Sequence, residues 1–322
     1  MKTQSRTTPV LAAALAVGLC VAAAGCGKYS WSNMKAMKAF KDANVAYQAQ
    51  DWKKAADRYE DAIEANPDLN AGGVTPYFFL ANSYDNLYKP ARAGEAENDA
   101  FIQKAIENYK ISAQKDTGQM RTRAMEYLVA AYGPEKLNDP ASAEPIVNQM
   151  IQMDPGEPAN YFYLAKIYED AGRYDDAEQT LLKAKEVKPS DPVVYTTLSA
   201  FYNRQGDFPK TMEALHQAAE LEPNNPEGYH RLAVFYWEKA FRDHRLPKKE
   251  KVEYLQKGVD AEDKALSLNP NYAEAMTYKN ILLRLQANET TDRKEQERLL
   301  KEADELRNRA MELTKKKASG LP

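Results

Sequence analysis

Apolar side chains in the central part of this chain recur at a regular spacing of about 34 residues. Within each period, large apolar residues lie three and four positions apart, which places them on one face of a helix. A small residue on the same face allows a second helix to approach closely. The repeating sets are Tyr161, Leu164, Ala165 and Tyr168; Tyr195, Leu198, Ser199 and Tyr202; and Tyr229, Leu232, Ala233 and Tyr236. The pattern predicts three consecutive repeats that each begin with an amphipathic helix.

A second helix is predicted to follow the first in each repeat. Gly172 stands after the first helix, where a residue in the left-handed conformation ends a helix at low cost. Residues 177–184 carry the apolar stripe of the second helix, and Pro189 ends it. Asp191 then caps the next helix, with Pro192 at its first position. The equivalent residues one period later are Gly206, Pro223, Asn225 and Pro226.

A period of this length with these residue types resembles the tetratricopeptide repeat family. The resemblance implies an all-α fold, an α-solenoid of about seven helix pairs that forms a right-handed superhelix. The expected frames are 36–69, 74–117, 122–157, 158–191, 192–225, 226–272 and 273–316, followed by a disordered tail at 317–322. Extra residues are expected between the helices of three frames, around 89–99, 134–140 and 244–252. The last helix, 295–317, has one apolar stripe on a charged background, which is typical of the closing end of a solenoid.

The N-terminal segment 1–26 differs from the rest of the chain. Lys2 and Arg6 precede an uncharged run at 10–24, which is too short to span a bilayer comfortably. The small residues before Cys26 resemble the signal of a bacterial lipoprotein, which would be removed as residues 1–25. This resemblance implies lipidation of Cys26, with 26–35 as a tether. An ordinary secretory signal and an uncleaved anchor are the alternatives.

The net charge of the chain indicates which classes of binding partner are disfavoured. The formal net charge is −3, and it becomes −5 for the segment 26–322, because the segment 1–25 carries two positive charges and no acid. Nucleic acids and anionic headgroups as main partners require clustered Lys and Arg, so an acidic surface disfavours both. Cys26 would be the only cysteine of the processed chain, which excludes an internal disulfide framework.

The sequence contains no pattern typical of catalysis or of cofactor binding. His216, His230 and His244 fall in different repeats or in an insertion, with no partner at the spacing of zinc ligands. A glycine-rich phosphate loop, a nucleophile elbow and a zinc protease helix are all missing from the sequence. We therefore expect a chain that is not an enzyme and that binds no cofactor and no metal.

The family resemblance implies that the first helix of each pair lines a concave groove. The expected groove residues are Phe40, Asn44, Tyr47, Phe78, Asn82, Asp85, Arg123, Glu126, Phe162, Lys166, Glu169, Thr196, Asn203, His230 and Trp237. Amides can bond the backbone of an extended peptide while aromatic rings bury its apolar side chains, so a peptide or a helix is the expected ligand. The alternative is that some of these aromatic residues pack between repeats. Members of the family that grip a terminal carboxylate use a lysine where this chain has Phe40, Phe78, Glu126 and Phe162, so that specialisation is not expected.

The sequence therefore favours a lipid-anchored adaptor that holds another protein of the bacterial envelope. Other envelope lipoproteins with such repeats serve in outer-membrane protein assembly and in pilus biogenesis, and a similar assembly or secretion complex is the expected setting. Gly27 follows the acylated position where aspartate would retain an enteric lipoprotein at the inner membrane, which favours the periplasmic face of the outer membrane. The alternatives are an enzyme or regulatory subunit that acts on the cell wall and a solute-binding lipoprotein. An open groove disfavours the second.

Overall fold

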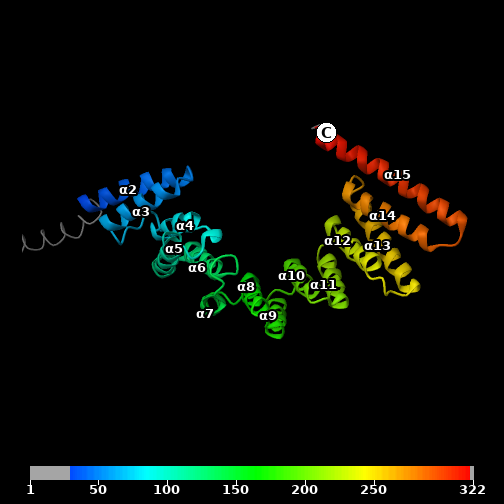
Figure 1. Cartoon of the computed structure of the whole chain (residues 1–322), viewed down its shortest axis with the longest axis horizontal. Coiled ribbons are helices and arrows are strands. Elements are labelled where there is room, and N and C mark those ends of the chain that lie inside the picture. The colour runs from blue at the N-terminus through cyan, green and yellow to red at the C-terminus, as the bar shows by residue number, and fades with distance from the viewer. Residues whose placement is uncertain (1–29, 320–322) are drawn as a thin grey trace, which may run out of the picture. The chain divides into compact units, whose positions relative to one another are not determined.

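The computed structural model of the chain describes residues 30–319, and within that range it contains helices and no strand. The signal segment, Cys26 and the last three residues lie outside the described residues. The α-helices are α2 (Trp31–Gln48), α3 (Trp52–Ala65), α4 (Tyr77–Leu87), α5 (Ala96–Lys115), α6 (Gly118–Tyr132), α7 (Pro140–Met153), α8 (Pro158–Asp170), α9 (Tyr174–Val187), α10 (Pro192–Arg204), α11 (Phe208–Leu221), α12 (Pro226–Arg242), α13 (Lys248–Leu268), α14 (Ala273–Glu289) and α15 (Arg293–Ala318) (Figure 1).

These helices follow one another as pairs, and each pair falls close to one predicted frame. Three bounds differ: α2 begins at Trp31, inside the expected tether, α6 begins at Gly118, before its frame, and α15 continues to Ala318, into the expected tail. The prediction of an all-α solenoid is confirmed. The expected insertion between α4 and α5 contains a short 3₁₀ turn, η2 (Pro90–Arg92). The insertion expected at 244–252 is shorter in the structure, because α12 continues to Arg242 and α13 already begins at Lys248. Only a short turn separates those two long helices.

The predicted helix ends are confirmed at the residues that carry the signal. The side chain of Asp191 accepts a hydrogen bond from the backbone N–H of Val193 at 2.9 Å and so caps α10. Asn225 caps α12 in the same way. Gly172 and Gly206 have φ of 74° and 75°, a conformation in which a Cβ would be strained. Local chemistry therefore sets the turns within the fourth and fifth pairs and the starts of the fifth and sixth.

The helices are grouped into two compact units, whereas the repeat pattern predicts one solenoid. The first unit contains α2–α7 and ends at Asp154, with the short segment Asp170–Gly172 also assigned to it. The second unit contains α8–α15 and begins at Pro155. Each unit has its own hydrophobic core, and each is described by itself below.

The core of the first unit is built around buried tyrosines. Tyr59, Tyr84 and Tyr109 are almost fully buried, and alanines fill the space where neighbouring helices approach. The ring of Tyr109 lies 5.7 Å from that of Phe78 and 5.5 Å from that of Tyr127. One ring on α5 therefore packs against both α4 and α6, which joins two successive helix pairs.

The core of the second unit depends on small residues at helix crossings. Ala165, Ser199 and Ala233 are at most 3% exposed, as their position in the repeat predicts. Gly258 on α13 has the same role, because a Cβ at this position would lie 2.9 Å from a methyl group of Leu282 on α14. Among the helices of residues 30–319, none is both long and apolar enough to cross a membrane.

Candidate functional site

Two of the aromatic residues expected in the groove lie in the interior of the first unit. Phe40 on α2 is 7% exposed and its ring packs against Tyr59, 5.8 Å away. Phe78 on α4 is 5% exposed and contacts the ring of Phe79 in addition to Tyr109 and Tyr127. Both rings hold helices together and offer no open surface to a ligand. The assignment of Phe40 and Phe78 to an accessible groove is corrected accordingly.

The two amides expected beside them are engaged by tyrosine hydroxyls. Asn44 accepts a hydrogen bond of 2.7 Å from Tyr59. Asn82, which is 6% exposed, accepts one of 2.6 Å from Tyr47 on α2 and donates one of 3.2 Å to Tyr109 on α5. Asn82 is thus a buried node that links three helices, and its assignment to an accessible groove is also corrected.

The expected groove residues of the second unit are more accessible. Phe162 on α8 is half-buried and Lys166, one turn later, is exposed. Arg204 on α10 forms an ion pair with Glu169 and donates two hydrogen bonds to its carboxylate, with N–O distances of 2.6 and 2.8 Å. Asn203 is exposed at the end of α10. In the first unit, Arg123 is exposed and Glu126 is half-buried, both on α6.

His230 on α12 lies against a buried carboxyl group. Its Nδ1 atom is 2.8 Å from Oε1 of Glu262 on α13, whose side chain is completely buried. Burial raises the pKa of Glu262 to about 7, and the hydrogen bond from His230 opposes this rise. The second oxygen, Oε2, is buried without a hydrogen-bond partner among the described residues. This carboxyl group is therefore poised to change its charge near neutral pH.

A strip of five rings runs from His230 along α12 and α14, and we call it the aromatic strip. The ring of His230 lies 5.2 Å from both Tyr272 and Tyr278. Tyr278 in turn meets Trp237 edge-on at 5.5 Å, and Phe241 stacks on Trp237 at 5.5 Å with an angle of 11°. Phe241 is 52% exposed, so the strip begins in the interior and reaches the surface. Sequence reasoning identified His230 and Trp237 and missed the other three.

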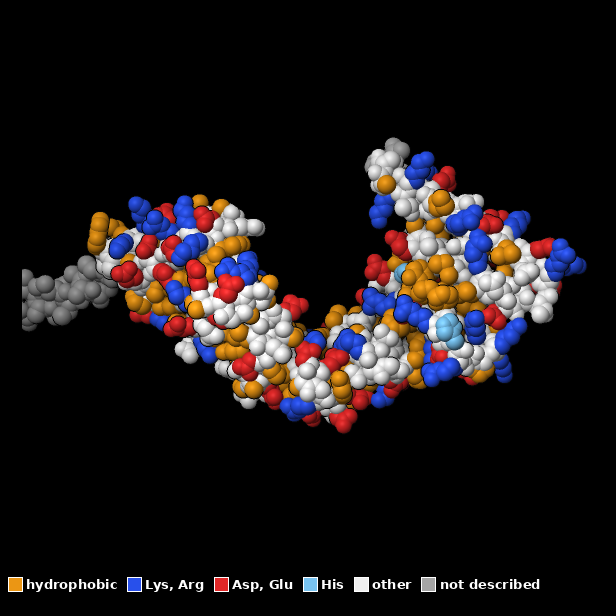
Figure 2. All heavy atoms as spheres, in the orientation of Figure 1, with side chains coloured by type: hydrophobic (Ala, Val, Ile, Leu, Met, Phe, Trp, Pro, Cys, Tyr) orange, Lys and Arg blue, Asp and Glu red, His pale blue; other side chains and the backbone are white. Residues whose placement is uncertain are grey.

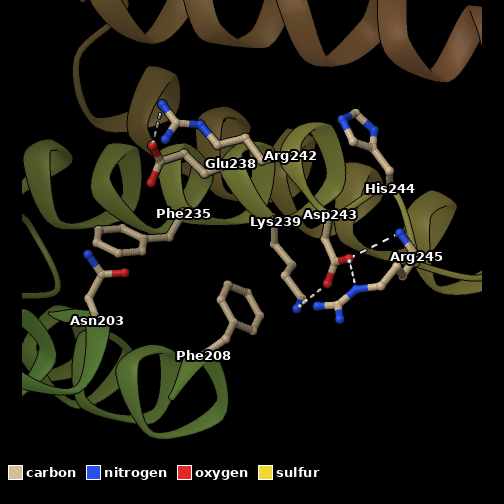
Figure 3. A pocket seen from close by; sticks show the side chains of 9 residues that line it. All are labelled: Asn203, Phe208, Phe235, Glu238, Lys239, Arg242, Asp243, His244 and Arg245. Atoms are coloured by element: carbon tan, nitrogen blue, oxygen red, sulfur yellow. Dashed lines mark hydrogen bonds and ion pairs between the residues drawn. The ribbon is translucent and has the colours of Figure 1, made fainter. Parts of the chain in front are cut away.

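A pocket of about 610 Å³ lies on the side of α12 that faces α10 and α11. It is lined by Asn203, Phe208, Phe235, Glu238, Lys239, Arg242, Asp243, His244 and Arg245 (Figure 3). Phe208 and Phe235 supply its apolar wall, and the residues after α12 form its polar end. One expected groove residue, Asn203, is thereby brought together with His244 of the expected insertion.

The charged residues of this pocket are paired, with one cation in excess. Lys239 bonds Asp243 at 2.8 Å and holds the pKa of that carboxyl below its ordinary value, so Asp243 stays ionised at neutral pH. Arg242 lies 3.3 Å from Glu238, and Arg245 lies 3.6 Å from Asp243. The side chains of Arg242 and Arg245 are 71% and 95% exposed, which leaves both guanidinium groups able to reorient toward a ligand carboxylate.

A match to a known family agrees with this architecture. Residues 136–200 match the family model of the tetratricopeptide repeat. The match falls on helices that belong to the repeating period and to the helix pairs described above. This part of the chain therefore carries the tetratricopeptide repeat. No curated protein matches the sequence.

Solved structures resemble this chain at low sequence identity. The C-terminal part of a tetratricopeptide repeat protein from Cytophaga hutchinsonii is 17% identical, with a TM-score of 0.55, and the alignment covers 85% of this chain and 98% of that one. A repeat protein from Parabacteroides merdae is 12% identical (TM-score 0.46; 84% and 99% covered), and yeast Tom70 is 16% identical (TM-score 0.43; 84% and 53% covered). The similarity to the Cytophaga protein shows the fold alone.

The aromatic strip and the pocket both use the first helix of the sixth pair. Trp237 and Phe241 of α12 belong to the strip, while their neighbours Glu238 and Arg242 belong to the pocket. Hydrophobic side chains gather on the surface over α12 and α13, bordered by Lys and Arg (Figure 2). No group of three or more possible metal ligands is found within residues 30–319. The site has the features of a surface for binding another protein.

Proposed function

We propose that this protein is a non-catalytic adaptor that binds a segment of another protein across α12. The observation that carries the proposal is the aromatic strip, which continues from the core to an exposed ring at Phe241 on α12, the same helix that lines a pocket with an apolar wall. Rigid aromatic side chains that are partly exposed next to a pocket are typical anchors of protein interfaces. The pocket has one more basic than acidic side chain, and Arg242 and Arg245 are its most exposed basic residues. This charge favours a segment that carries an acidic residue beside its apolar ones.

An unsatisfied polar atom supports binding at the same place. The indole N–H of Trp237 is buried without an acceptor among the described residues, which costs about 1–3 kcal/mol. Phe241 covers the face of this indole. An acceptor that binding brought into the plane of the indole ring would satisfy the donor and would remove a cost that the free protein carries.

We place this adaptor in the bacterial cell envelope, anchored by a lipid at Cys26. The support comes from the sequence: a short apolar run after two basic residues, small residues before Cys26, and Gly27 after it, which favours the periplasmic face of the outer membrane. An assembly or secretion complex is the proposed setting, because an adaptor with repeats suits the joining of several proteins.

Replacing Phe241 with alanine is expected to weaken capture of the partner roughly thirtyfold, because truncation of an anchor residue costs about 2 kcal/mol. The melting temperature should change little, since half of this side chain is exposed. The measurement is a pull-down from envelope extract, with the chain lacking its signal and Cys26 as bait, followed by titration of the captured protein.

Tyr174→Ala is the matched control, because this aromatic side chain at the start of α9 is 49% exposed and lies outside the aromatic strip. It should capture the same partner with unchanged affinity. Equal capture by wild type and Phe241→Ala would place the binding surface elsewhere, on the exposed residues of α8 or on the insertion near η2.

Replacing Cys26 with serine is expected to abolish acylation, because only a thiol accepts the diacylglyceryl group. The exported protein should move from the membrane fraction to the soluble periplasmic fraction. Mass spectrometry of the mature N-terminus of the wild-type protein tests the same point directly. A mature chain that begins elsewhere, or that begins at an unmodified Cys26, would exclude the lipid anchor.

A further inference from the structure

The first helix of the first unit exposes apolar side chains on the face opposite its core. α2 buries Ala36, Ala39, Phe40, Ala43 and Ala46 against its neighbours. Its other face carries Trp31, Met34 and Val45, which are 79%, 50% and 68% exposed. Trp31 and Val45 are separated by close to four helical turns, so both point in nearly the same direction. Packing within the unit does not account for these three side chains.

The same face of α2 is basic. Lys35, Lys38 and Lys41 are exposed, while Asp42 is the one acid in the helix. Lys38 lies midway between Trp31 and Val45 on a single line along the helix, and Met34 and Lys41 form a second line beside it. Among the ion pairs of residues 30–319, none involves these three lysines.

The neighbouring acids on α3 leave this positive charge largely uncompensated, because they have partners of their own. Asp57 pairs with Lys53 at 3.0 Å, and Asp61 pairs with Arg58 at 2.9 Å. Figure 2 shows a hydrophobic side chain at the N-terminal end of α2 and basic side chains farther along the helix. An exposed helix face that combines tryptophan, aliphatic side chains and lysines is typical of a helix that lies in a membrane interface.

We propose that this face of α2 lies on the surface of an anionic phospholipid bilayer. The inference rests on the proposed anchor in one respect: Cys26 shortly precedes Trp31 in the sequence, and the span between them is at most about 17 Å. A lipid at Cys26 therefore holds the first turn of α2 close to the headgroups, where the effective concentration of the surface is high.

Each side chain of the face has a role in this contact. The indole of Trp31 is apolar with one polar N–H, and it suits the boundary between headgroups and acyl chains. Met34 and Val45 add apolar area on the same side, and the lysines attract anionic headgroups. The helix is about 27 Å long, so it would fix the first unit flat against the bilayer instead of leaving it on a free tether.

The test uses the full mature chain with Cys26→Ser, so that binding cannot come from an acyl chain. Sedimentation with vesicles of phosphatidylglycerol and phosphatidylethanolamine should show binding that phosphatidylcholine vesicles do not show. Trp31→Ala should weaken this binding about tenfold. The triple change Lys35→Gln, Lys38→Gln and Lys41→Gln should weaken it roughly a hundredfold, at about fivefold per lysine. Circular dichroism should be unchanged in each variant, because all four side chains are exposed.

Matched controls come from the second unit. Val193→Ala removes an apolar side chain on α10 that is 54% exposed, and Lys248→Gln with Lys249→Gln removes two exposed lysines at the start of α13. Both controls should bind vesicles like the wild type. Equal binding by the α2 variants and the wild type would overturn the proposal, as would no binding to either kind of vesicle.

Two further outcomes separate this inference from the proposed anchor and from another use of the face. A native Cys26 without an acyl chain, together with vesicle binding that depends on Trp31, would exclude the anchor and support the lipid contact of α2. Self-association of the soluble chain that Trp31→Ala abolishes, without vesicle binding, would show an interface between two copies and would overturn the lipid contact.

Discussion

Replacing Tyr109 with alanine is expected to destabilise the first unit by roughly 4 kcal/mol or more. The side chain is completely buried, and its ring joins α4 and α6 through contacts with Phe78 and Tyr127. Removal of the ring leaves a cavity, and removal of the hydroxyl leaves the buried groups of Asn82 and Asp85 without this partner. The loss of packing and the unpaired polar groups both contribute to the loss of stability, because the same substitution causes both.

Urea unfolding followed by hydrogen exchange provides the measurement. Each repeat contacts mainly its neighbours, so loss of amide protection should centre on α4–α6 while α14 and α15 stay protected. Tyr109→Phe is the matched control: it keeps the ring and removes only the hydroxyl, so it should cost about 1–2 kcal/mol. A uniform loss of protection along the whole chain would contradict the repeat organisation that underlies this prediction.

The features that the sequence predicted correctly are those that depend on neighbouring residues. Gly172 ends α8 because its left-handed conformation is a local requirement, and Asp191 caps α10 through a bond to the next turn. Ala165 and Ala233 are buried at helix crossings because their small size recurs with the period. Local chemistry repeated in every period is thus sufficient to give the helix pairs and the order in which they follow.

Whether a residue is accessible in the groove depends on contacts between residues that are distant in the sequence. The sequence pattern was less informative about these contacts. Phe78 and Asn82 occupy positions on a first helix that would face outward in an isolated pair. In the folded unit, Tyr127 from α6 packs on the ring of Phe78, and Tyr47 from α2 bonds the amide of Asn82. No spacing along one helix indicates such contacts, which join residues 35 or more positions apart.

The sequence pattern indicated only His230 and Trp237 of the aromatic strip, and the reason is a different one. The sixth frame, 226–272, is longer than the repeat period, so the position of Phe241 has no counterpart in the better framed repeats. The extension of α12 to Arg242 is what carries Phe241 one turn beyond Trp237. A search for aromatic residues four and seven positions apart on α12, without the template of the family, would have joined His230, Trp237 and Phe241.

The carboxyl group at the inner end of this strip is expected to make the stability of the second unit depend on pH. Burial raises the pKa of Glu262 from 4.5 to about 7, so the folded chain retains a proton that the unfolded chain releases. The stabilising effect of the protonated group is complete below about pH 4.5 and is lost as the pH rises through about 7. The loss is on the order of 3 kcal/mol.

Glu262→Gln should abolish this dependence, because an amide keeps the size of the side chain and does not titrate. The groups around it are His230, which faces Oε1, and Asp263, whose charge raises the pKa of Glu262 further. Urea unfolding between pH 5 and pH 8 should show the wild type losing stability with rising pH, while the variant stays nearly constant and is the more stable of the two at pH 8. The exposed Glu274→Gln controls for net charge and should follow the wild type. If Glu262→Gln and the wild type lost stability in parallel across this range, Glu262 would not titrate between pH 5 and pH 8 in the folded chain, and the proposed pH dependence would be wrong.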